Sequence, residues 1–273
     1  MTLLAADFEF IAKLIHQKNG LMLTPEKEYL LETRLSPIAR KWNLSDLPAL
    51  VRKLRVFAEP ALLEEISDAM TTNETLFFRD LKPFEALKAE ILPKLCAARK
   101  GTKRVRIWCA AASSGQEPYS IAITLLEEKH KYPDIQFEII GTDINKDILK
   151  RAEEGIYTQF EVQRGLPIQL LVKYFKQDGD RWQIKDELRR MVQYKVFNLL
   201  QDPAQFGQFD IIFCRNVLIY FDIATKQKIV ERLHSRLAHD GYVILGGSEA
   251  MLGISEKFTV PAGLRSIYTP LAK

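Results

Sequence analysis

Cysteine is scarce in this sequence: the 273 residues include only three, widely spaced at Cys96, Cys109 and Cys214. An odd and scattered set of this kind argues against a disulfide framework and lacks the paired spacing of a zinc knuckle. The four histidines are equally isolated, and none forms an HExxH or similar ligand pair. We therefore expect reduced thiols and no bound metal.

Long apolar runs are also missing. No stretch approaches the roughly 18 residues needed to cross a bilayer, and the N-terminal segment MTLLAADFEFIAK carries acids where a secretion signal would carry Lys or Arg. These absences predict a cytoplasmic protein without membrane insertion. The composition, 47% hydrophobic and 27% charged, is that of an ordinary globular protein. The length favours two domains, and a monomer is the default expectation.

Residues 7–70 predict a succession of amphipathic helices. Thr24 before Pro25 is a typical helix start, and the segment SDLPALVRKLRV repeats this pattern of a polar cap ahead of a proline. Pro37 falls inside RLSPIARKW, where continuing a helix would cost about 3 kcal/mol. We therefore expect Ser36 to cap a new helix at that point.

From residue 105 the pattern changes to alternating strands and helices. Apolar runs typical of strands (VRIWCA, FEIIGTD, VQYKVFN, FDIIFCR, GYVILGG) alternate with helical segments such as PYSIAITLLEEKH and ATKQKIVERLHSRLA. This alternation predicts an α/β fold, a mostly parallel, doubly wound sheet with helices on both faces. Within it, KYFKQDGDRWQIKDEL has short strands around an Asp-Gly turn, which predicts a small antiparallel insertion at about residues 168–190.

The ends of these strands carry the candidate site residues, because ligands of open parallel sheets bind beyond the carboxyl ends of the strands. Small side chains at residues 110–115 let a ligand approach the backbone after the first strand. Asp143 ends the second strand, where it would grip a ribose diol or, alternatively, cap the next helix. The third and fourth strands end in a further set of residues: Asn198, Leu199, Cys214, Arg215 and Asn216.

The turn after the first strand lacks the spaced glycines of a dinucleotide-binding loop. Ser114 and Glu117 match the spacing of a capping box, but Pro118 favours the first helical position, which predicts Glu117 itself as the helix cap. Its carboxylate would then face the crevice, where it suits a ligand with an ammonium group and repels a pyrophosphate. The pattern favours a nucleoside that carries a cation and disfavours a nicotinamide oxidoreductase.

Five segments resemble, in order and spacing, the motifs of the chemotaxis receptor glutamate methyltransferases, the CheR family: TTNETLFFRD, WCAAASSGQEPYSIAI, GTDIN, NLL and FDIIFCRNVLIYFD. The resemblance spans nearly the whole chain. It implies a Rossmann-like class I S-adenosylmethionine-dependent methyltransferase domain over residues 93–273, with the antiparallel subdomain at about 168–190. It also implies an all-α receptor-recognition domain over residues 1–76 and a linker over 77–92 that carries part of the cofactor site.

The resemblance also implies a cofactor and its ligands. S-adenosylmethionine, or its product S-adenosylhomocysteine, would be held by the residues that match the family motifs: Asn73, Thr75, Arg79, Glu117, Asp143, Asn198, Leu199, Cys214 and Arg215. The strand-end pattern adds Asn216 to this set. Arg79 and Tyr220 match the positions proposed to act at the methyl-transfer centre, although Arg79 would also suit a surface ion pair and Tyr220 a buried core position.

The predicted chemistry needs no catalytic histidine. A glutamate side chain, with a reference pKa near 4.3, is already an anionic nucleophile at neutral pH. The enzyme must mainly align the carboxylate oxygen, the methyl carbon and the sulfur. We expect Arg79 to orient the incoming carboxylate or the cofactor, and Tyr220 to hydrogen-bond beside the transferred methyl group.

The basic N-terminal segment predicts the protein partner. Residues 13–55 contain nine Lys and Arg and four Asp and Glu, a local net charge of +5. The family resemblance suggests docking to acidic methylation helices of chemoreceptors through Arg34 and Arg40, with Pro37 interrupting the segment. The short hairpin FKQDGDRWQIK lacks additional glycines, so we predict no tight binding of a receptor C-terminal peptide.

The sequence leaves two other functions to consider. An RNA methyltransferase is disfavoured, and no nucleic acid is expected, because no Asn-Pro-Pro-Tyr type motif follows the fourth strand and no basic surface is interleaved with aromatics. A non-catalytic S-adenosylmethionine-binding adaptor is disfavoured by the presence of both Arg79 and Tyr220.

Overall fold

The computed structural model describes residues 3–271; residues 1–2 and 272–273, which the domain prediction included, lie outside the described part. The chain divides into two compact units. The helical unit comprises the described residues up to Thr72 together with Tyr220–Thr225. The α/β unit comprises Asn73–Ile219 and the described residues from Lys226 onward. Each unit is taken separately below.

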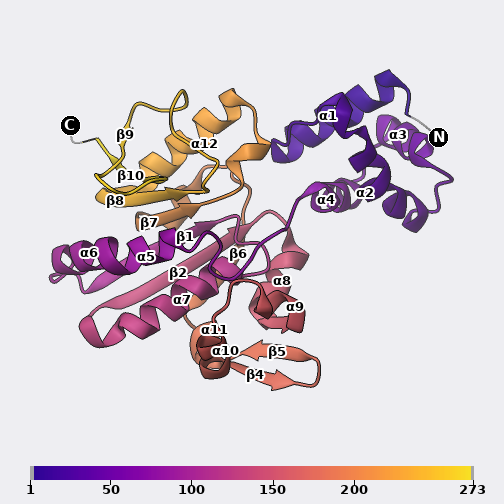
Figure 1. The fold of residues 1–273 in the computed structure, drawn as a ribbon. Helices are drawn as coiled ribbons and strands as arrows, with labels where there is room; N and C mark the ends of the chain where they lie inside the picture. The colour runs from indigo at the N-terminus through magenta and orange to yellow at the C-terminus, as the bar shows by residue number, and fades with distance from the viewer. Residues whose placement is uncertain (1–2, 272–273) are drawn as a thin grey trace. The chain divides into compact units, whose positions relative to one another are not determined.

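The helical unit contains four α-helices and a short 3₁₀ turn. Their bounds are α1 Ala5–Asn19, η1 Pro25–Lys27, α2 Glu28–Lys41, α3 Leu47–Val56 and α4 Pro60–Met70 (Figure 1, indigo and purple). The apolar faces of the helices meet in one core, whose innermost side chains include Ile11, Leu31, Leu35, Leu50 and Leu62. The predicted succession of amphipathic helices is confirmed.

Pro37 does not break the chain into two helices, so the predicted new helix at Ser36 is wrong. Pro37 lies inside α2, and the Ser36 hydroxyl donates back to the Glu32 carbonyl at 2.5 Å. The cost of the proline is offset because α2 buries side chains on both sides of it, among them Leu35 and Ile38. Tertiary packing thus overrides the local preference.

The polar cap of α3 is the residue directly after Ser45, with which the predicted segment begins. The Asp46 carboxylate accepts from the Ala49 backbone N–H at 2.8 Å, which makes Asp46 the N-cap. Pro48 follows in the first turn, as the sequence pattern predicts. At the other predicted start, Thr24 precedes the 3₁₀ turn η1 rather than an α-helix.

The α/β unit is built on a seven-stranded sheet with the order β6-β2-β1-β7-β8-β10-β9. The strands are β1 Arg104–Ala110, β2 Gln136–Asp143, β6 Val192–Val196, β7 Phe209–Cys214, β8 Leu237–Leu245, β9 Phe258–Thr259 and β10 Ile267–Pro270. The first five in spatial order are parallel, and β10 pairs antiparallel with both of its neighbours, β8 and β9. The predicted mostly parallel, doubly wound sheet is confirmed.

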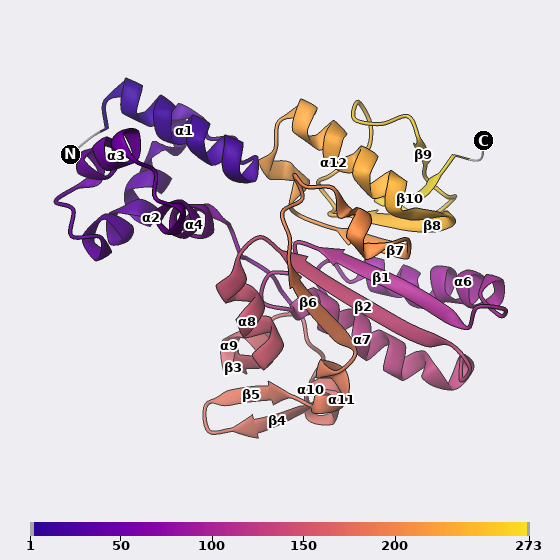
Figure 2. The same ribbon diagram turned by 180° about the vertical axis from the view of Figure 1, so that it is seen from behind.

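Helices cover both faces of this sheet. Figures 1 and 2 show α5, α6 and α7 on one face and α12 on the other. The helical segments that lie wholly or mostly in the unit are α5 Lys82–Ala86, η2 Leu87–Ile91, α6 Leu92–Ala98, α7 Gln116–Glu128, η3 Lys129–Lys131, α8 Lys146–Glu154, α9 Gln159–Gln163, α10 Ile168–Tyr174, α11 Asp186–Arg189, η4 Pro203–Phe206, η5 Leu218–Tyr220 and α12 Ile223–Arg236. Because α7 follows β1 and α8 follows β2, both helices begin at the carboxyl edge of the sheet.

A second, smaller sheet is antiparallel and has the order β3-β5-β4. It includes the predicted hairpin, formed by β4 Phe175–Asp178 and β5 Arg181–Ile184 around Gly179, which has a φ of 58°. Its third strand, β3 Ile156–Thr158, comes from outside residues 168–190 and pairs with β5. In the described part of the chain, no helix is long and apolar enough to cross a membrane.

Candidate functional site

The turn between β1 and α7 has an unusual backbone. Ala111, Ser113 and Gly115 have φ values of 67°, 49° and 92°. Left-handed residues of this kind cost about 1–2 kcal/mol each when they are not glycine. Alternation of left- and right-handed residues turns successive backbone N–H groups inward, which makes a concavity for an anion. The small-residue run thus forms a tight turn with a left-handed backbone, and close approach of a ligand to it stays a prediction.

The Asp143 side chain, at the end of β2, accepts a hydrogen bond from this turn. Its Oδ2 accepts from the Ser113 backbone N–H at 2.9 Å, and its Oδ1 accepts from the Asn145 N–H at 3.0 Å. Burial raises the pKa of Asp143, and the backbone N–H groups oppose that rise. The alternative role as a helix cap is wrong, because the Asn145 side chain accepts from the Ile148 N–H and caps α8. Ile144 is a third backbone donor to this carboxylate, which leaves about one of its four acceptor positions for a ligand.

Asn73, another predicted residue, contacts the same turn. The Ser113 hydroxyl donates to the Asn73 carbonyl at 2.8 Å, so Asn73 and Asp143 are joined through one serine. Phe197, just after β6, donates its N–H to the Asp143 carbonyl at 2.8 Å, which brings the end of that strand alongside. Thr75 lies two residues after Asn73 and is half-buried.

The two predicted residues after β6 make local contacts. The Asn198 Oδ1 accepts from the Leu200 backbone N–H at 2.9 Å, and the Leu199 carbonyl accepts from Arg232 Nη1 at 3.3 Å. These contacts fix the direction of the segment that leaves Phe197 beside Asp143. The segment is therefore held in place on the carboxyl edge of the sheet.

Arg79 lies in a strained segment. Phe78, Asp80 and Leu81 have φ values of 50°, 65° and 35°, in a region that costs of order 1–3 kcal/mol for each non-glycine residue. The surroundings hold this backbone: the Phe78 N–H donates to the Ser120 hydroxyl at 2.9 Å. Arg79 itself is half-buried and donates from Nη1 to the Glu74 carbonyl at 3.1 Å. Backbone strain of this kind is concentrated at functional sites.

Arg215 connects this segment to α7. Its side chain is 1% exposed. Nη1 donates to Glu117 Oε2 at 2.9 Å. Nη2 donates to the Arg79 carbonyl at 2.8 Å and to Asp80 Oδ2 at 2.7 Å. Burial raises the pKa of the Glu117 carboxyl, while the positive charges of Arg215 and then Arg79 oppose that rise. The structure thus brings together three of the predicted residues, which come from the end of β7 onward, from α7 and from the segment before α5: Arg215, directly after β7, Glu117 and Arg79.

The prediction that Glu117 caps α7 is wrong. The N-cap is Gly115. It has a left-handed conformation, which glycine adopts without strain. Glu117 is the second helical residue and Pro118 the third. The first four N–H groups of a helix have no partner within the helix, so a proline is tolerated there as well. The Glu117 carboxylate therefore lies in the first turn, where Arg215 neutralises it.

One donor of this cluster has no partner. Among the described residues, three buried side-chain N or O atoms lack a hydrogen bond, and Arg215 Nε is the only charged one. Leaving a buried donor unsatisfied costs about 1–3 kcal/mol, and more for a charged group. A ligand that brings an acceptor, such as a carboxylate, would satisfy Arg215 Nε. The donor set thus fits a zwitterionic nucleoside: Asp143 for hydroxyl groups, Glu117 for an ammonium and Arg215 for a carboxylate.

Cys214 and Asn216 flank Arg215. Cys214 is fully buried, and burial raises the pKa of its thiol well above the usual range, so it is not a nucleophile. Asn216 has a φ of 56° and begins the loop that leaves the sheet.

Glu249 holds that loop, and sequence reasoning missed it. Its Oε2 accepts from the N–H groups of Asn216 at 2.7 Å and Gly246 at 2.8 Å, and its Oε1 from those of Val217 at 3.0 Å and Ile219 at 3.2 Å. The carboxylate is 7% exposed. One signal in the sequence could have identified Glu249: it is an acid two residues after the glycine pair that ends a predicted strand.

The remaining predicted residues, Arg34, Arg40 and Tyr220, belong to the helical unit. Arg34 Nη1 donates to the carbonyls of Met70 and Thr71, both at 2.9 Å, so its guanidinium closes the C-terminal end of α4. Arg40 is exposed on α2. The predicted role of Arg34 and Arg40 in receptor contact stays a prediction.

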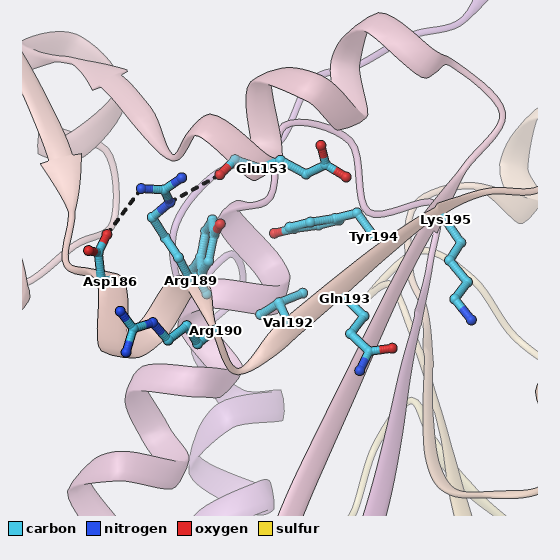
Figure 3. Close-up of a pocket in the computed structure, with 9 residues that line it drawn as sticks. Glu153, Asp186, Arg189, Arg190, Val192, Gln193, Tyr194 and Lys195 are labelled. Carbon is cyan, nitrogen blue, oxygen red and sulfur yellow. Dashed lines mark hydrogen bonds and ion pairs between the residues drawn. The ribbon is translucent and has the colours of Figure 1, made fainter.

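A separate pocket lies beside β6 in the α/β unit. Its volume is about 570 Å³, and it is lined by residues of α11 and β6 among others (Figure 3). Arg189 donates there to Asp186 and to the Glu153 carbonyl, both at 3.1 Å. The Tyr194 ring forms part of its wall, and a side-chain carbon on Gly115 would meet the Tyr194 hydroxyl at 2.7 Å. No predicted site residue lines this pocket.

Comparison with known proteins covers nearly the whole chain. The family model for the CheR methyltransferase all-alpha domain matches residues 6–71, and that for the CheR methyltransferase S-adenosylmethionine-binding domain matches residues 73–265. Chemotaxis protein methyltransferase Cher2 of Pseudomonas putida is 39% identical over 256 residues, which cover 92% of this chain and 93% of the relative.

Two further relatives are similarly related. Chemotaxis protein methyltransferase 1 of Pseudomonas aeruginosa is 40% identical over 257 residues, 93% of each chain. The chemotaxis protein methyltransferase of Vibrio parahaemolyticus is 38% identical over 261 residues, 94% of each chain.

Proposed function

Because the chain belongs to the CheR methyltransferase family, we propose that it methylates glutamate side chains on the cytoplasmic helices of chemoreceptors, giving methyl esters. It is an S-adenosylmethionine-dependent methyltransferase of that family. The observation that carries the proposal is the buried Arg215–Glu117 pair, which joins the first turn of α7 to the segment of Arg79. We propose that this activity takes place in the cytoplasm and serves adaptation in chemotaxis.

The cofactor is proposed to lie along the carboxyl edge of the parallel strands. Asp143 would accept hydrogen bonds from the ribose hydroxyls and Glu117 from the ammonium, and Arg215 Nε would donate to the carboxylate of the methionine part. The other proposed contacts are Asn73, Thr75, Arg79, Asn198, Leu199, Cys214 and Asn216. When bound, S-adenosylmethionine supplies a methyl group already activated by a positively charged sulfur.

The protein's own task is then to position the substrate. The glutamate carboxylate arrives ionised, since its reference pKa is near 4.3, so no general base is required. Alignment alone supplies several kcal/mol, up to roughly 7–11 in ideal cases. Arg79 is proposed to orient the carboxylate. The backbone of its neighbours Phe78 and Asp80 is strained, and the Arg79 carbonyl accepts from Arg215. Tyr220 is proposed to hydrogen-bond beside the transferred methyl group.

Docking is proposed to use the basic face of the helical unit. Residues 13–55 carry a net charge of +5 from nine basic and four acidic residues, which favours acidic helices. Arg40 is exposed on α2 and is the better placed of the two proposed contacts, because Arg34 already bonds to the end of α4. Recognition is proposed not to depend on a receptor C-terminal peptide, and the protein to act as a monomer.

The test is methyl transfer from labelled S-adenosylmethionine to receptor cytoplasmic domains, followed by alkaline hydrolysis. We expect label that alkali releases as methanol, and its loss in Arg79→Ala with the fold retained. Label that resists alkali would indicate a methylated amine and contradict the proposal. Cofactor binding without any transfer to receptors would favour an adaptor function instead.

A further inference from the structure

Tyr220 is held by the N-terminal segment of the helical unit. The Met22 N–H donates to the Tyr220 carbonyl at 3.0 Å, and Phe221 forms an antiparallel bridge with Leu21. His16 lies 2.6 Å from Asp222, measured from Nε2 to Oδ2. Three successive residues, 220 to 222, thus each have a partner in residues 16–22.

The preceding residues are held in the other unit. Glu249 accepts the N–H groups of Val217 and Ile219 within the α/β unit. The chain passes from the α/β unit to the helical unit between Ile219 and Tyr220. The backbone is therefore anchored on both sides of this junction, by a carboxylate before it and by a β-bridge and the His16–Asp222 contact after it.

We propose that His16, together with the Leu21–Met22 segment, is a positioning element for Tyr220 in methyl transfer. These residues would then affect the chemical step through Tyr220, which lies in the same unit as they do. This inference rests on the proposed function, and in particular on the role of Tyr220. The physical basis is that a tyrosine on a free loop must lose conformational freedom before it can act, whereas one fixed beforehand does not.

His16 is the residue to change, because Asp222 has a second task. Asp222 Oδ1 accepts from the Thr225 N–H at 2.8 Å, so its replacement would also affect the start of α12. The matched control is Asp7→Ala, which breaks the Asp7–Arg55 pair at 3.1 Å in the same unit. The two pairs have similar exposure, 44% and 30% for His16 and Asp222 against 43% and 21% for Arg55 and Asp7.

The experiment measures kcat and KM for receptor methylation, the dissociation constant for S-adenosylmethionine and thermal unfolding. We expect His16→Ala to lower kcat about tenfold to a hundredfold, in line with the cost of misplacing a reacting group. KM and the cofactor dissociation constant should stay within about twofold, and Asp7→Ala should leave kcat unchanged. An unchanged kcat in His16→Ala, or an equal fall in Asp7→Ala, would overturn the inference.

A double variant separates this inference from the proposed function. If His16 acts through Tyr220, His16→Ala should cost little further activity in a Tyr220→Phe background, because residues that act as a unit are not additive. Full additivity would overturn the positioning role even though methyl transfer occurs. If the wild-type protein methylates no receptor, the proposed function fails first. If Tyr220→Phe has full activity, the role of Tyr220 fails and the inference with it.

Discussion

Arg215 and Glu117 form a buried ion pair, with Nη1 and Oε2 2.9 Å apart, although 98 positions separate them in the chain. They meet because β7 lies next to β1 in the sheet, so the residues after both strands share one edge. The same guanidinium bonds to the carbonyl of Arg79. A single side chain thus joins the first turn of α7 to the segment that precedes α5.

Removing this guanidinium should affect both stability and cofactor binding. We expect Arg215→Ala to lower the free energy of unfolding by about 3–5 kcal/mol, because it leaves the Glu117 carboxylate buried without its partner. Denaturant unfolding and calorimetric titration with S-adenosylhomocysteine would measure both effects. Lys94→Ala, which breaks the exposed Lys94–Glu90 pair, is the control and should cost less than about 1 kcal/mol. Equal costs in the two variants would contradict the buried role of Arg215.

Replacing Glu249 should loosen the loop after β7. In Glu249→Gln one oxygen becomes an NH₂ group that faces backbone N–H donors, so we expect a loss of about 3 kcal/mol in the free energy of unfolding. Methyl transfer should fall as well, since the loop leads to Tyr220. Glu256→Gln changes an exposed acid on a nearby loop and should leave both quantities unchanged. Wild-type activity and stability in Glu249→Gln would refute this role.

Charge reversal on α2 should distinguish docking from stability. We expect Arg40→Glu to raise KM for the receptor about fivefold, the equivalent of roughly 1 kcal/mol, with thermal stability unchanged. Arg34→Glu should also lower the free energy of unfolding by about 1–3 kcal/mol, because Arg34 bonds to the last carbonyls of α4. Steady-state kinetics and denaturant unfolding check the pair. An Arg40→Glu enzyme with unchanged KM would exclude this residue from docking.

Asp222 should make stability depend on pH in the acid range. The Thr225 N–H first, and His16 second, lower the pKa of Asp222 from 3.8 to about 2. A carboxyl with a lowered pKa in the folded state contributes stability above about pH 4, and this contribution is lost as the pH falls toward 2. Asp222→Asn keeps a capping side chain but cannot titrate. The stability difference between wild type and variant should therefore shrink from pH 5 to pH 2, and a constant difference would contradict the shift.

Much of the fold follows from local patterns. Apolar runs of strand length alternate with helical segments from residue 105, and this alternation predicts the doubly wound sheet around β1 and β2. Asp143 could be selected because it ends a strand, a position that a parallel sheet places at its carboxyl edge. The Asp-Gly turn predicts the hairpin of β4 and β5. No local pattern predicts β3, since its pairing depends on β5 from later in the chain.

The errors arose where local preference met tertiary packing. Pro37 disfavours a helix, yet α2 continues through it because the side chains on both sides are buried in one core. Pro118 suggests Glu117 as the cap, yet the cap is the left-handed Gly115, two residues earlier than predicted. Glu249 was missed because its partners are backbone N–H groups, which leave no mark in the sequence.

The sequence by itself determined the class of fold, the family motifs and the residue types available at the strand ends, because these depend on spacing and polarity along the chain. Only the tertiary structure decided which of them are partners. The Arg215–Glu117 pair depends on the order of the strands, and the partners of Tyr220 and Asp222 lie about 200 positions upstream, at residues 16–22. Contacts of this kind arise when the packing of whole elements brings distant segments together, and no short-range pattern encodes them.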